Sequence, residues 1–274
     1  MNGNPLITPT PLILLPPSEG KASGGEGPPL DLASLSFESL NPVRQRFALA
    51  LAKNSQRPRA AQKLLGVKGP ALAKAMADNT GLESAPTLPA IKRYTGVMYD
   101  AIDYRSLSAD ARDAFGRTVI IMSGLFGMVR PRDMIPAYKL KMGGKLLRGR
   151  TCASVWKRLI TKSLVGVAEN RVIWYLLPIE HSAAWDHLAV PYKTRFTVKF
   201  LQRNADGQLK TVSHWSKALK GALVRHLVLN IDSSGTTDPA LDLVARFTHP
   251  EGFKFHPALT SETDRTTEIV FLKD

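Results

Sequence analysis

The chain has 274 residues, and its 37 Lys and Arg against 23 Asp and Glu give a formal net charge of +14. A chain of this length with 44% hydrophobic residues buries roughly 75% of its unfolded surface, which excludes overall disorder and a collagen-like structure. No segment has the roughly 18 uninterrupted apolar residues of a membrane span, so we expect no membrane partner. The single cysteine cannot form an internal disulfide, and no basic segment precedes the first apolar stretch. We therefore expect a cytoplasmic protein.

The N-terminal part predicts a strand, a loop and a helix. The apolar run Leu12–Leu15 is closed by two prolines and predicts a buried strand. The glycine-rich loop Ser18–Pro29 follows it, and such a loop commonly carries ligand-contacting groups. A helix is expected to run to about Lys53, with Asn41 as its N-cap and Pro42 as its first residue.

The segment Leu64–Lys74 contains two glycines before a helix expected over Pro70–Asp78. Together with its flanks, at about residues 56–80, it resembles a helix-hairpin-helix element, in which the backbone N–H groups of a helix N-terminus hold a phosphate. Lys68 and Lys74 would add attraction that does not depend on base sequence. The glycine spacing is Gly-x-x-Gly rather than the commoner Gly-x-Gly, so a helix pair without a ligand remains the alternative.

The middle of the chain predicts two helices around a buried strand. The first helix is expected over Ala109–Phe115, between Ser108 and Gly116. The β-branched and apolar run Thr118–Ser123 predicts a central buried strand. Thr151–Val165 has helical periodicity.

The C-terminal part predicts further strands and helices. The expected strands are Val172–Leu177, Thr194–Leu201, Leu209–Trp215 and Thr267–Leu272. The expected helices are Ser216–Leu229 and about Pro239–Phe247. Asp206-Gly207 lies between the second and third strands and is typical of a β-hairpin turn. Because strands and helices alternate without regular βαβ units, we expect one α/β or α+β domain, spanning residues 1–274, with a mixed sheet.

Positive charge is concentrated between Arg117 and Arg171, the basic segment. Twelve Lys or Arg face only two acids there, which supplies +10 of the +14. Such a surplus attracts polyanions such as nucleic acid, and the nearby glycines and Tyr138 would allow close approach and stacking. A solvated face that merely keeps the protein in solution is the alternative.

Several common site motifs are absent. The sequence has no complete phosphate-binding loop and no G-x-G-x-x-G fingerprint. His181 and His187 are six residues apart, which does not place two imidazoles on one helical face for zinc. Cys152 has no base next to it in the sequence, so we interpret it as a core thiol. We therefore expect neither a metal nor a cofactor.

The most informative stretch is Ile120–Met142. A strand leads into Ser123-Gly124-Leu125-Phe126-Gly127, followed by Arg130-Pro131-Arg132-Asp133 and Tyr138-Lys139-Leu140-Lys141-Met142. These motifs resemble, in order and spacing, those of the YaaA family of peroxide stress proteins. Leu12–Lys21, Tyr94-Thr95-Gly96, Trp156 and Lys217–Gly221 also match, so the resemblance spans about Leu12 to Phe271.

The resemblance implies a single α/β domain with a positively charged cleft, DNA binding, and a role in limiting oxidative damage. Carried onto this sequence, the cleft residues would be Ser18, Lys21, Tyr94, Ser123, Arg130, Asp133, Tyr138, Lys139, Lys217 and Lys220. Arg132, in the same motif, is a further binding candidate. For three of these residues a structural role stays open: Asp133 can cap the turn after Pro131, and Tyr94 and Tyr138 can be core aromatics with a bonded hydroxyl.

Two departures from the family pattern point to a specialised member. The family usually has Asn-Leu-x-Ser-x-Glu-Tyr after the strand that corresponds to Val172–Leu177, whereas here Glu180 keeps the acid and His181 replaces the tyrosine. The family's Lys-Lys-Ala-Arg-Gly becomes Lys217–Gly221, with one cation fewer. An imidazole that titrates near neutrality suits proton transfer better than DNA packing.

Two functions remain open at this point. In the first, the chain is a binding protein whose basic residues hold the phosphates of duplex or distorted DNA. In the second, it is an enzyme that acts on a small anionic or nucleotide-like substrate, within a specialised biosynthetic pathway. The catalytic candidates of this second function are Lys21, Ser123, Glu180, His181 and Lys217.

Overall fold

A mixed sheet forms the centre of the molecule. The computed structural model describes residues 10–147, 149–212, 216–230 and 240–274. Within these ranges a nine-stranded sheet has the order β10-β11-β7-β6-β1-β3-β4, with β8 beside β7 and β9 beside β11. Its strands are β1 (Leu12–Leu15), β3 (Val119–Ser123), β4 (Gly127–Val129), β6 (Val172–Tyr175), β7 (Thr194–Arg203), β8 (Leu209–Thr211), β9 (Lys254–Phe255), β10 (Ser261–Thr263) and β11 (Thr266–Lys273). A separate antiparallel pair joins β2 (Leu88–Pro89) to β5 (Met134–Ile135).

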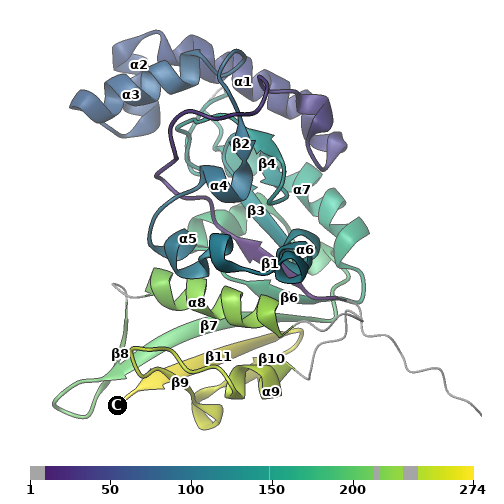
Figure 1. Cartoon of the computed structure of the whole chain (residues 1–274), viewed down its shortest axis with the longest axis vertical. Helices are drawn as coiled ribbons and strands as arrows, with labels where there is room; N and C mark the ends of the chain where they lie inside the picture. The colour runs from purple at the N-terminus through teal and green to yellow at the C-terminus, as the bar shows by residue number, and fades with distance from the viewer. Residues whose placement is uncertain (1–9, 148, 213–215, 231–239) are drawn as a thin grey trace, which may run out of the picture.

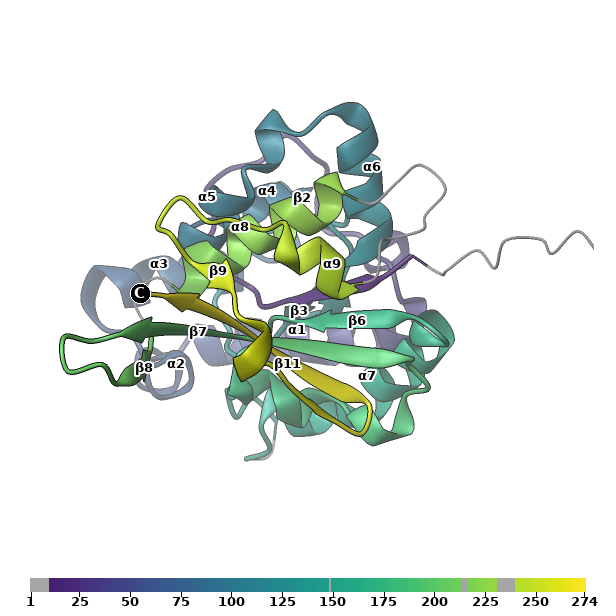
Figure 2. The ribbon, with the colours of Figure 1, turned by 90° about the horizontal axis from the view of Figure 1, so that it is seen from below.

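Helices cover both faces of this sheet. They are α1 (Asn41–Ser55), α2 (Pro58–Leu65), α3 (Gly69–Thr80), α4 (Ala90–Arg93), α5 (Val97–Ile102), α6 (Ala109–Thr118), α7 (Cys152–Ala168), α8 (Ser216–Leu229) and α9 (Ala240–Ala245). Figure 2 shows α5, α6, α8 and α9 on one side of the sheet and α7 on the other. Figure 1 shows α1, α2 and α3 as a layer at one end of the long axis, with β8 and β9 at the opposite end.

The interior strands explain why the sequence shows continuous apolar runs. β1 pairs in parallel with β3 and with β6, and β7 pairs in parallel with β6 and β11. All residues of β1 and β3 are fully buried. Parallel strands with both faces covered by helices need side chains that are apolar throughout rather than in alternation. The prediction of a mixed α/β sheet is confirmed.

Several expected boundaries differ in the structure. Asn41 is not an N-cap: α1 begins at this residue after Leu40, and the Asn41 Oδ1 accepts a hydrogen bond from the Arg44 guanidinium at 2.8 Å. Gly116 does not end α6, which continues to Thr118, although the Ser108 side chain caps the helix start by accepting from the Ala111 N–H at 3.2 Å.

The expected C-terminal elements are present with shifted ends. The hairpin pairs β7 with a short β8, and Ser213–Trp215 of its expected second strand lie outside the described residues. Pro239, the expected start of α9, also lies outside them. Cys152 is buried, and burial raises the pKa of its thiol to about 12, as expected of a core thiol. In the described part of the chain, none of the helices has both the length and the apolar character that crossing a membrane requires.

Gly124, in the turn after β3, is where the chain packs most tightly against the segment that follows β5. A Cβ atom at this position would lie 2.7 Å from the carbonyl oxygen of Leu140 and 2.9 Å from the carbonyl carbon of Lys141. The carbonyl oxygen of Gly124 also accepts a hydrogen bond from the Trp156 indole at 3.0 Å. Only glycine allows this approach, because the opposing atoms belong to the backbone.

We predict that Gly124→Ala lowers the free energy of unfolding by about 1 to 3 kcal/mol, the usual cost of forcing an extra methyl group into a packed interior. Gly143→Ala is the matched control, because a Cβ at Gly143 would meet no atom within 4 Å. Urea unfolding of the two variants measures the difference. Equal stabilities would show that the 124–141 contact is not tight.

Candidate functional site

Three loops meet at the carboxyl ends of three neighbouring strands of the sheet. β1, β3 and β6 are neighbours and run in parallel, so their carboxyl ends lie together, as they do at ligand sites of open α/β sheets. Lys21 follows β1, Ser123 ends β3, and His181 follows β6. The sheet topology therefore brings together three residues that are far apart in the sequence.

Lys21 lies between two tyrosine rings. It forms an antiparallel bridge with Tyr94, and its Nζ lies 4.5 Å from the centroid of the Tyr138 ring and 5.4 Å from that of Tyr94. The same amine donates a hydrogen bond to the carbonyl oxygen of Ser18 at 2.7 Å. Burial, and next the positive charge of Lys139, lower the pKa of Lys21 to about 7. The ring faces attract the charged form and so moderate this shift.

Three buried hydroxyl groups form a chain behind the amine. The Tyr94 and Tyr138 hydroxyls are 2.8 Å apart, and the Tyr138 hydroxyl is 2.8 Å from the Ser123 Oγ. The backbone N–H of Phe126 donates to that Oγ at 2.9 Å. Burial raises the pKa of Tyr138 to about 12 and that of Tyr94 well above its ordinary value, so both phenols stay neutral. Three hydroxyls joined by two hydrogen bonds leave one O–H proton for a further acceptor.

Glu19 holds two lysines at the surface of the site. One of its carboxylate oxygens lies 3.2 Å from the Lys139 Nζ, and the other lies 3.1 Å from the Lys141 Nζ. Lys141, and next Lys139, hold the pKa of Glu19 below its ordinary value. The two lysines thus converge on a single carboxylate.

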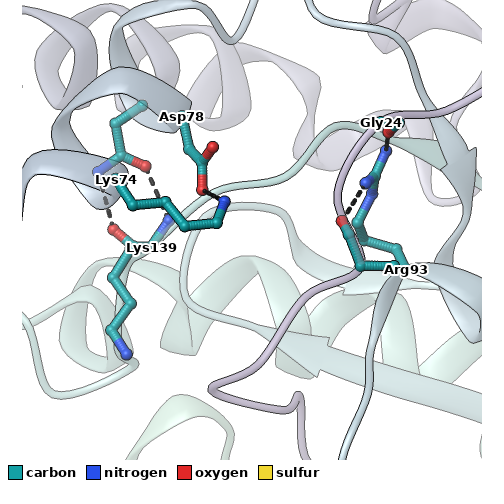
Figure 3. A network of polar contacts seen from close by, with 7 residues as sticks. Gly24, Lys74, Asp78, Arg93 and Lys139 are labelled. Atoms are coloured by element: carbon teal, nitrogen blue, oxygen red, sulfur yellow. Dashed lines mark hydrogen bonds and ion pairs between the residues drawn. The ribbon is translucent and has the colours of Figure 1, made fainter. Parts of the chain in front are cut away.

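The backbone of Lys139 is fixed by α3. The Asn79 side chain accepts from the Lys139 N–H at 2.8 Å and donates to the Lys139 carbonyl oxygen at 3.0 Å. Figure 3 shows this paired contact beside the ion pair between Lys74 and Asp78. The lysine that faces Glu19 is therefore anchored to the helical layer.

A cavity of about 50 Å³ lies against these groups. Its lining residues are Pro17, Ser18, Glu19, Lys21, Lys139, Leu140, Lys141, Met142, Glu180 and His181. This cavity, called the Lys21 cavity below, contains five of the residues singled out from the sequence: Ser18, Lys21, Lys139, Glu180 and His181.

His181 is the least solvated polar group of the Lys21 cavity. Its side chain is 2% exposed, and neither ring nitrogen has a hydrogen-bond partner among the described residues. The nearest acid, Glu180, lies 3.8 Å from its Nδ1, which is too far for a hydrogen bond. Burial lowers the pKa of His181 to about 4, so the imidazole is neutral at physiological pH and has one donor and one acceptor free.

Three of the expected binding residues lie elsewhere: Arg130, Arg132 and Asp133. Arg130 donates to the carbonyl oxygens of Arg117 and Val119, which are at the start of β3, whereas Ser123 is at its end. Arg132 pairs with Asp113. These residues border a different hollow, of about 660 Å³, so the structure does not join them to the Lys21 cavity.

The Asp133 carboxylate joins two segments of the chain by hydrogen bonds. Its carboxylate accepts hydrogen bonds from the backbone N–H of Arg130 at 2.9 Å and from the Ser36 hydroxyl at 2.7 Å. It also accepts from the Ser36 N–H at 3.2 Å. These contacts are those of a residue that caps a turn, the structural role left open for Asp133 above.

The remaining expected residues also lie outside the Lys21 cavity. Ser123 is fully buried behind Tyr138. Lys217 is exposed in the first turn of α8, and Lys220 donates to the carbonyl oxygen of Leu176 at 3.2 Å. Burial lowers the pKa of Lys220. Lys68, just before α3, is exposed.

Two features of this part of the molecule were not predicted from the sequence. Glu19 and Lys141 were not proposed as site residues, although both stand in the motifs that carried the family resemblance. Residues 41–80 hold eight Lys or Arg against one acid, Asp78. A count of charged residues over that range would have found this positive charge outside the basic segment.

The comparisons with known proteins agree with the motifs. The family model described as peroxide stress protein YaaA matches residues 12–259. The chain belongs to the YaaA family. It is 39% identical over 237 residues to a UPF0246 protein of Corynebacterium efficiens, covering 85% of this chain and 91% of the relative. It is 36% identical over 218 residues to a UPF0246 protein of Streptomyces coelicolor, covering 79% and 82%.

Within the described ranges, this YaaA-family chain has no group of three or more His, Cys, Asp or Glu side chains arranged to hold a metal ion.

We predict that one lysine of this protein titrates near pH 7, because burial lowers the pKa of Lys21 from 10.5 to about 7. The unfolded chain then holds a proton between these two pH values that the folded chain lacks, so the free energy of unfolding rises with pH across this interval. NMR of ¹³C-labelled lysine measures the titration. Lys21→Met should remove the resonance and reduce the rise, part of which remains because burial also lowers the pKa of Lys220. A Lys21 that titrates with the other lysines would contradict the prediction.

Proposed function

We propose that this YaaA-family protein binds DNA in the cytoplasm through the helical layer α1–α3 and the neighbouring loop of residues 141–150, together called the basic end. The family name links the chain to peroxide stress, and DNA is a principal target of oxidative damage. The supporting observation is that two concentrations of positive charge, each with few acids and far apart in the sequence, lie side by side at this end.

The helical layer provides the first concentration. Of its eight Lys and Arg, seven are exposed and only Arg44 is buried. The exposed cations are Arg46, Lys53, Arg57, Arg59, Lys63, Lys68 and Lys74. Asp78 is the one acid in this range, and it pairs with Lys74 at 2.7 Å. The other exposed cations therefore have no acidic neighbour within the layer.

The loop of residues 141–150 provides the second. It contributes exposed Lys141, Lys145 and Arg150 and has no acid. A hollow of about 410 Å³ is lined by α1 and α2 on one side and by the loop on the other. Lys63 and Lys145 both line it, as do Gly143 and Gly144.

This arrangement suits a phosphate backbone. Lysines and arginines neutralise phosphates and release condensed counterions, without reading base sequence. The turn between α2 and α3, where Gly66 has a φ of 67°, exposes the start of α3, and a helix N-terminus favours an anion. The helix pair supports the proposal, but by itself it does not establish a helix-hairpin-helix module.

We predict that Lys63→Gln with Lys145→Gln weakens DNA binding and lowers the slope of log K against log salt by roughly 2, since each phosphate contact contributes about 0.9. Lys210→Gln with Lys254→Gln removes the same charge from β8 and β9, at the opposite end of the molecule (Figure 1), and should leave the slope unchanged. Fluorescence anisotropy with duplex and bulged DNA measures both. Binding that is absent, or that both pairs weaken equally, would contradict the proposal.

A second function is favoured by the shape of the Lys21 cavity. A narrow cavity that holds an amine, an imidazole and a carboxylate suits chemistry on a small anionic substrate better than contact with a duplex. Lys139 and Lys141 already bind one carboxylate, that of Glu19. We propose that they hold the anionic group of such a substrate.

We predict that Glu19→Gln tightens binding of inorganic phosphate severalfold, because the variant frees two lysines from an internal competitor. Glu26→Gln is the control, since Glu26 is an exposed carboxylate of the same loop. NMR shift titration of the lysine amines measures the affinity. No difference between the two variants would show that Glu19 does not occupy the anion position.

A further inference from the structure

We propose that Lys21 is an amine nucleophile that forms an imine with a carbonyl compound carrying a carboxylate or phosphate group. This inference rests on the second function above and names its reaction and substrate class. It is carried by the placement of the amine, of two converging lysines and of an unpartnered imidazole on one small cavity.

The surroundings of Lys21 keep its amine available for attack. Lys21 lines the Lys21 cavity, and its Nζ donates one hydrogen bond, to the carbonyl oxygen of Ser18. The faces of two tyrosine rings lie near the Nζ and attract the ammonium. Burial and the positive charge of Lys139 disfavour the ammonium more strongly than the carboxylates of Glu19 and Asp78 favour it. A lysine in such surroundings is partly neutral near pH 7, and only the neutral amine has the lone pair that attacks a carbonyl carbon.

The charge of the substrate follows from Lys139 and Lys141. Both reach a single carboxylate at 3.2 and 3.1 Å, and both line the cavity that exposes Lys21. An external carboxylate or phosphate that displaces Glu19 would be held within the reach of the amine. The volume of about 50 Å³ admits a reacting carbonyl and a few neighbouring atoms rather than a whole base.

His181 provides the proton transfers that the condensation needs. The Lys21 nitrogen bonds to the carbonyl carbon, and one N–H proton passes by way of the neutral imidazole to the carbonyl oxygen, which gives a carbinolamine. The second N–H proton passes in the same way to the departing hydroxyl group. The C–O bond then breaks, and amine plus carbonyl have become imine plus water, with no oxidant or reductant. The imidazole is suited to both roles because neither nitrogen is engaged by another described residue.

A carbonyl next to an anionic group has two sources. One is a free small molecule such as an oxo acid or a sugar phosphate. The other, consistent with DNA binding at the basic end, is the ring-opened aldehyde of an abasic nucleotide, which stands between two phosphates. The chemistry at Lys21 is the same in both cases, and the experiment has an arm for each.

The test is reductive trapping on the full chain at pH 7. In one arm the protein is incubated with glyoxylate and sodium cyanoborohydride, and in the other with an abasic-site duplex and sodium borohydride. Peptide mass spectrometry then locates the reduced adduct. We expect Lys21 to be labelled at least about tenfold faster than the other lysines, since one unit of pKa changes the neutral fraction about tenfold.

Matched variants support the assignment. Lys21→Met should lose the trapped product, and Lys254→Met, on β9, should retain it. Labelling with glyoxylate identifies a small carbonyl acid, and a covalent complex with abasic DNA through Lys21 identifies the nucleic-acid source. If Lys21→Met does not fold, the distribution of adducts in the unmodified sequence still shows whether Lys21 reacts faster than the other lysines.

Two results separate this inference from the function on which it rests. If neither arm labels Lys21 ahead of the other lysines while phosphate still binds and Glu19→Gln tightens it, the imine proposal is overturned and the anion site stands. If phosphate binding is absent as well, both are overturned.

Discussion

The parallel pairing of β1 with β3 and β6 is the constraint on which the candidate site depends. Strands that run in the same direction in one sheet end at the same edge, so the loops after Leu15, Ser123 and Tyr175 are forced together. Each strand is buried by helices, which fixes its register through apolar side chains alone. The polar residues of the three loops are therefore placed by a scaffold to which they contribute little.

Two buried arginines hold the irregular segments around that scaffold. Arg44 donates to the carbonyl oxygens of Ser36, Phe126 and Met128. Arg93 does the same for the segments next to Lys21, reaching the carbonyl oxygens of Ala22, Gly24 and Ile135. Figure 3 shows its contact with Gly24. Burial lowers the pKa of Arg44 to about 10 and also lowers that of Arg93. The net charge of +14 thus includes cations that serve as internal crosslinks between loops and are not available to a ligand.

Apolar patterns were sufficient to predict the main elements of the fold. Leu12–Leu15 and Ser216–Leu229 coincide with β1 and α8, because an unbroken apolar run and a helical period are local signals. Gly116 misled the prediction of the end of α6, because the helix continues through it to Thr118. The short strands β4, β9 and β10 have two or three residues each, and their pairing depends on distant partners that a local pattern does not contain.

The candidate site was predictable in its chemistry but not in its geometry. Lys21, Tyr94, Tyr138 and Lys139, which the family resemblance singled out, lie close together. Arg130 belongs to the same motif, but β4 lies between it and the turn at Ser123, and its side chain extends back to the start of β3. Spacing along the chain does not show at which end of a strand a side chain will lie. Charge alone likewise does not distinguish a cation that crosslinks loops from one that faces solvent.

The Asn79 amide joins the helical layer to the segment that lines the Lys21 cavity. Through two hydrogen bonds it ties the Lys139 peptide to α3, and α3 also carries Lys74, an exposed cation of the basic end. A tilt of this helix under a polyelectrolyte would displace the ammonium that faces Glu19. One side-chain amide therefore makes the placement of Lys139 beside the Lys21 cavity depend on the position of a surface helix.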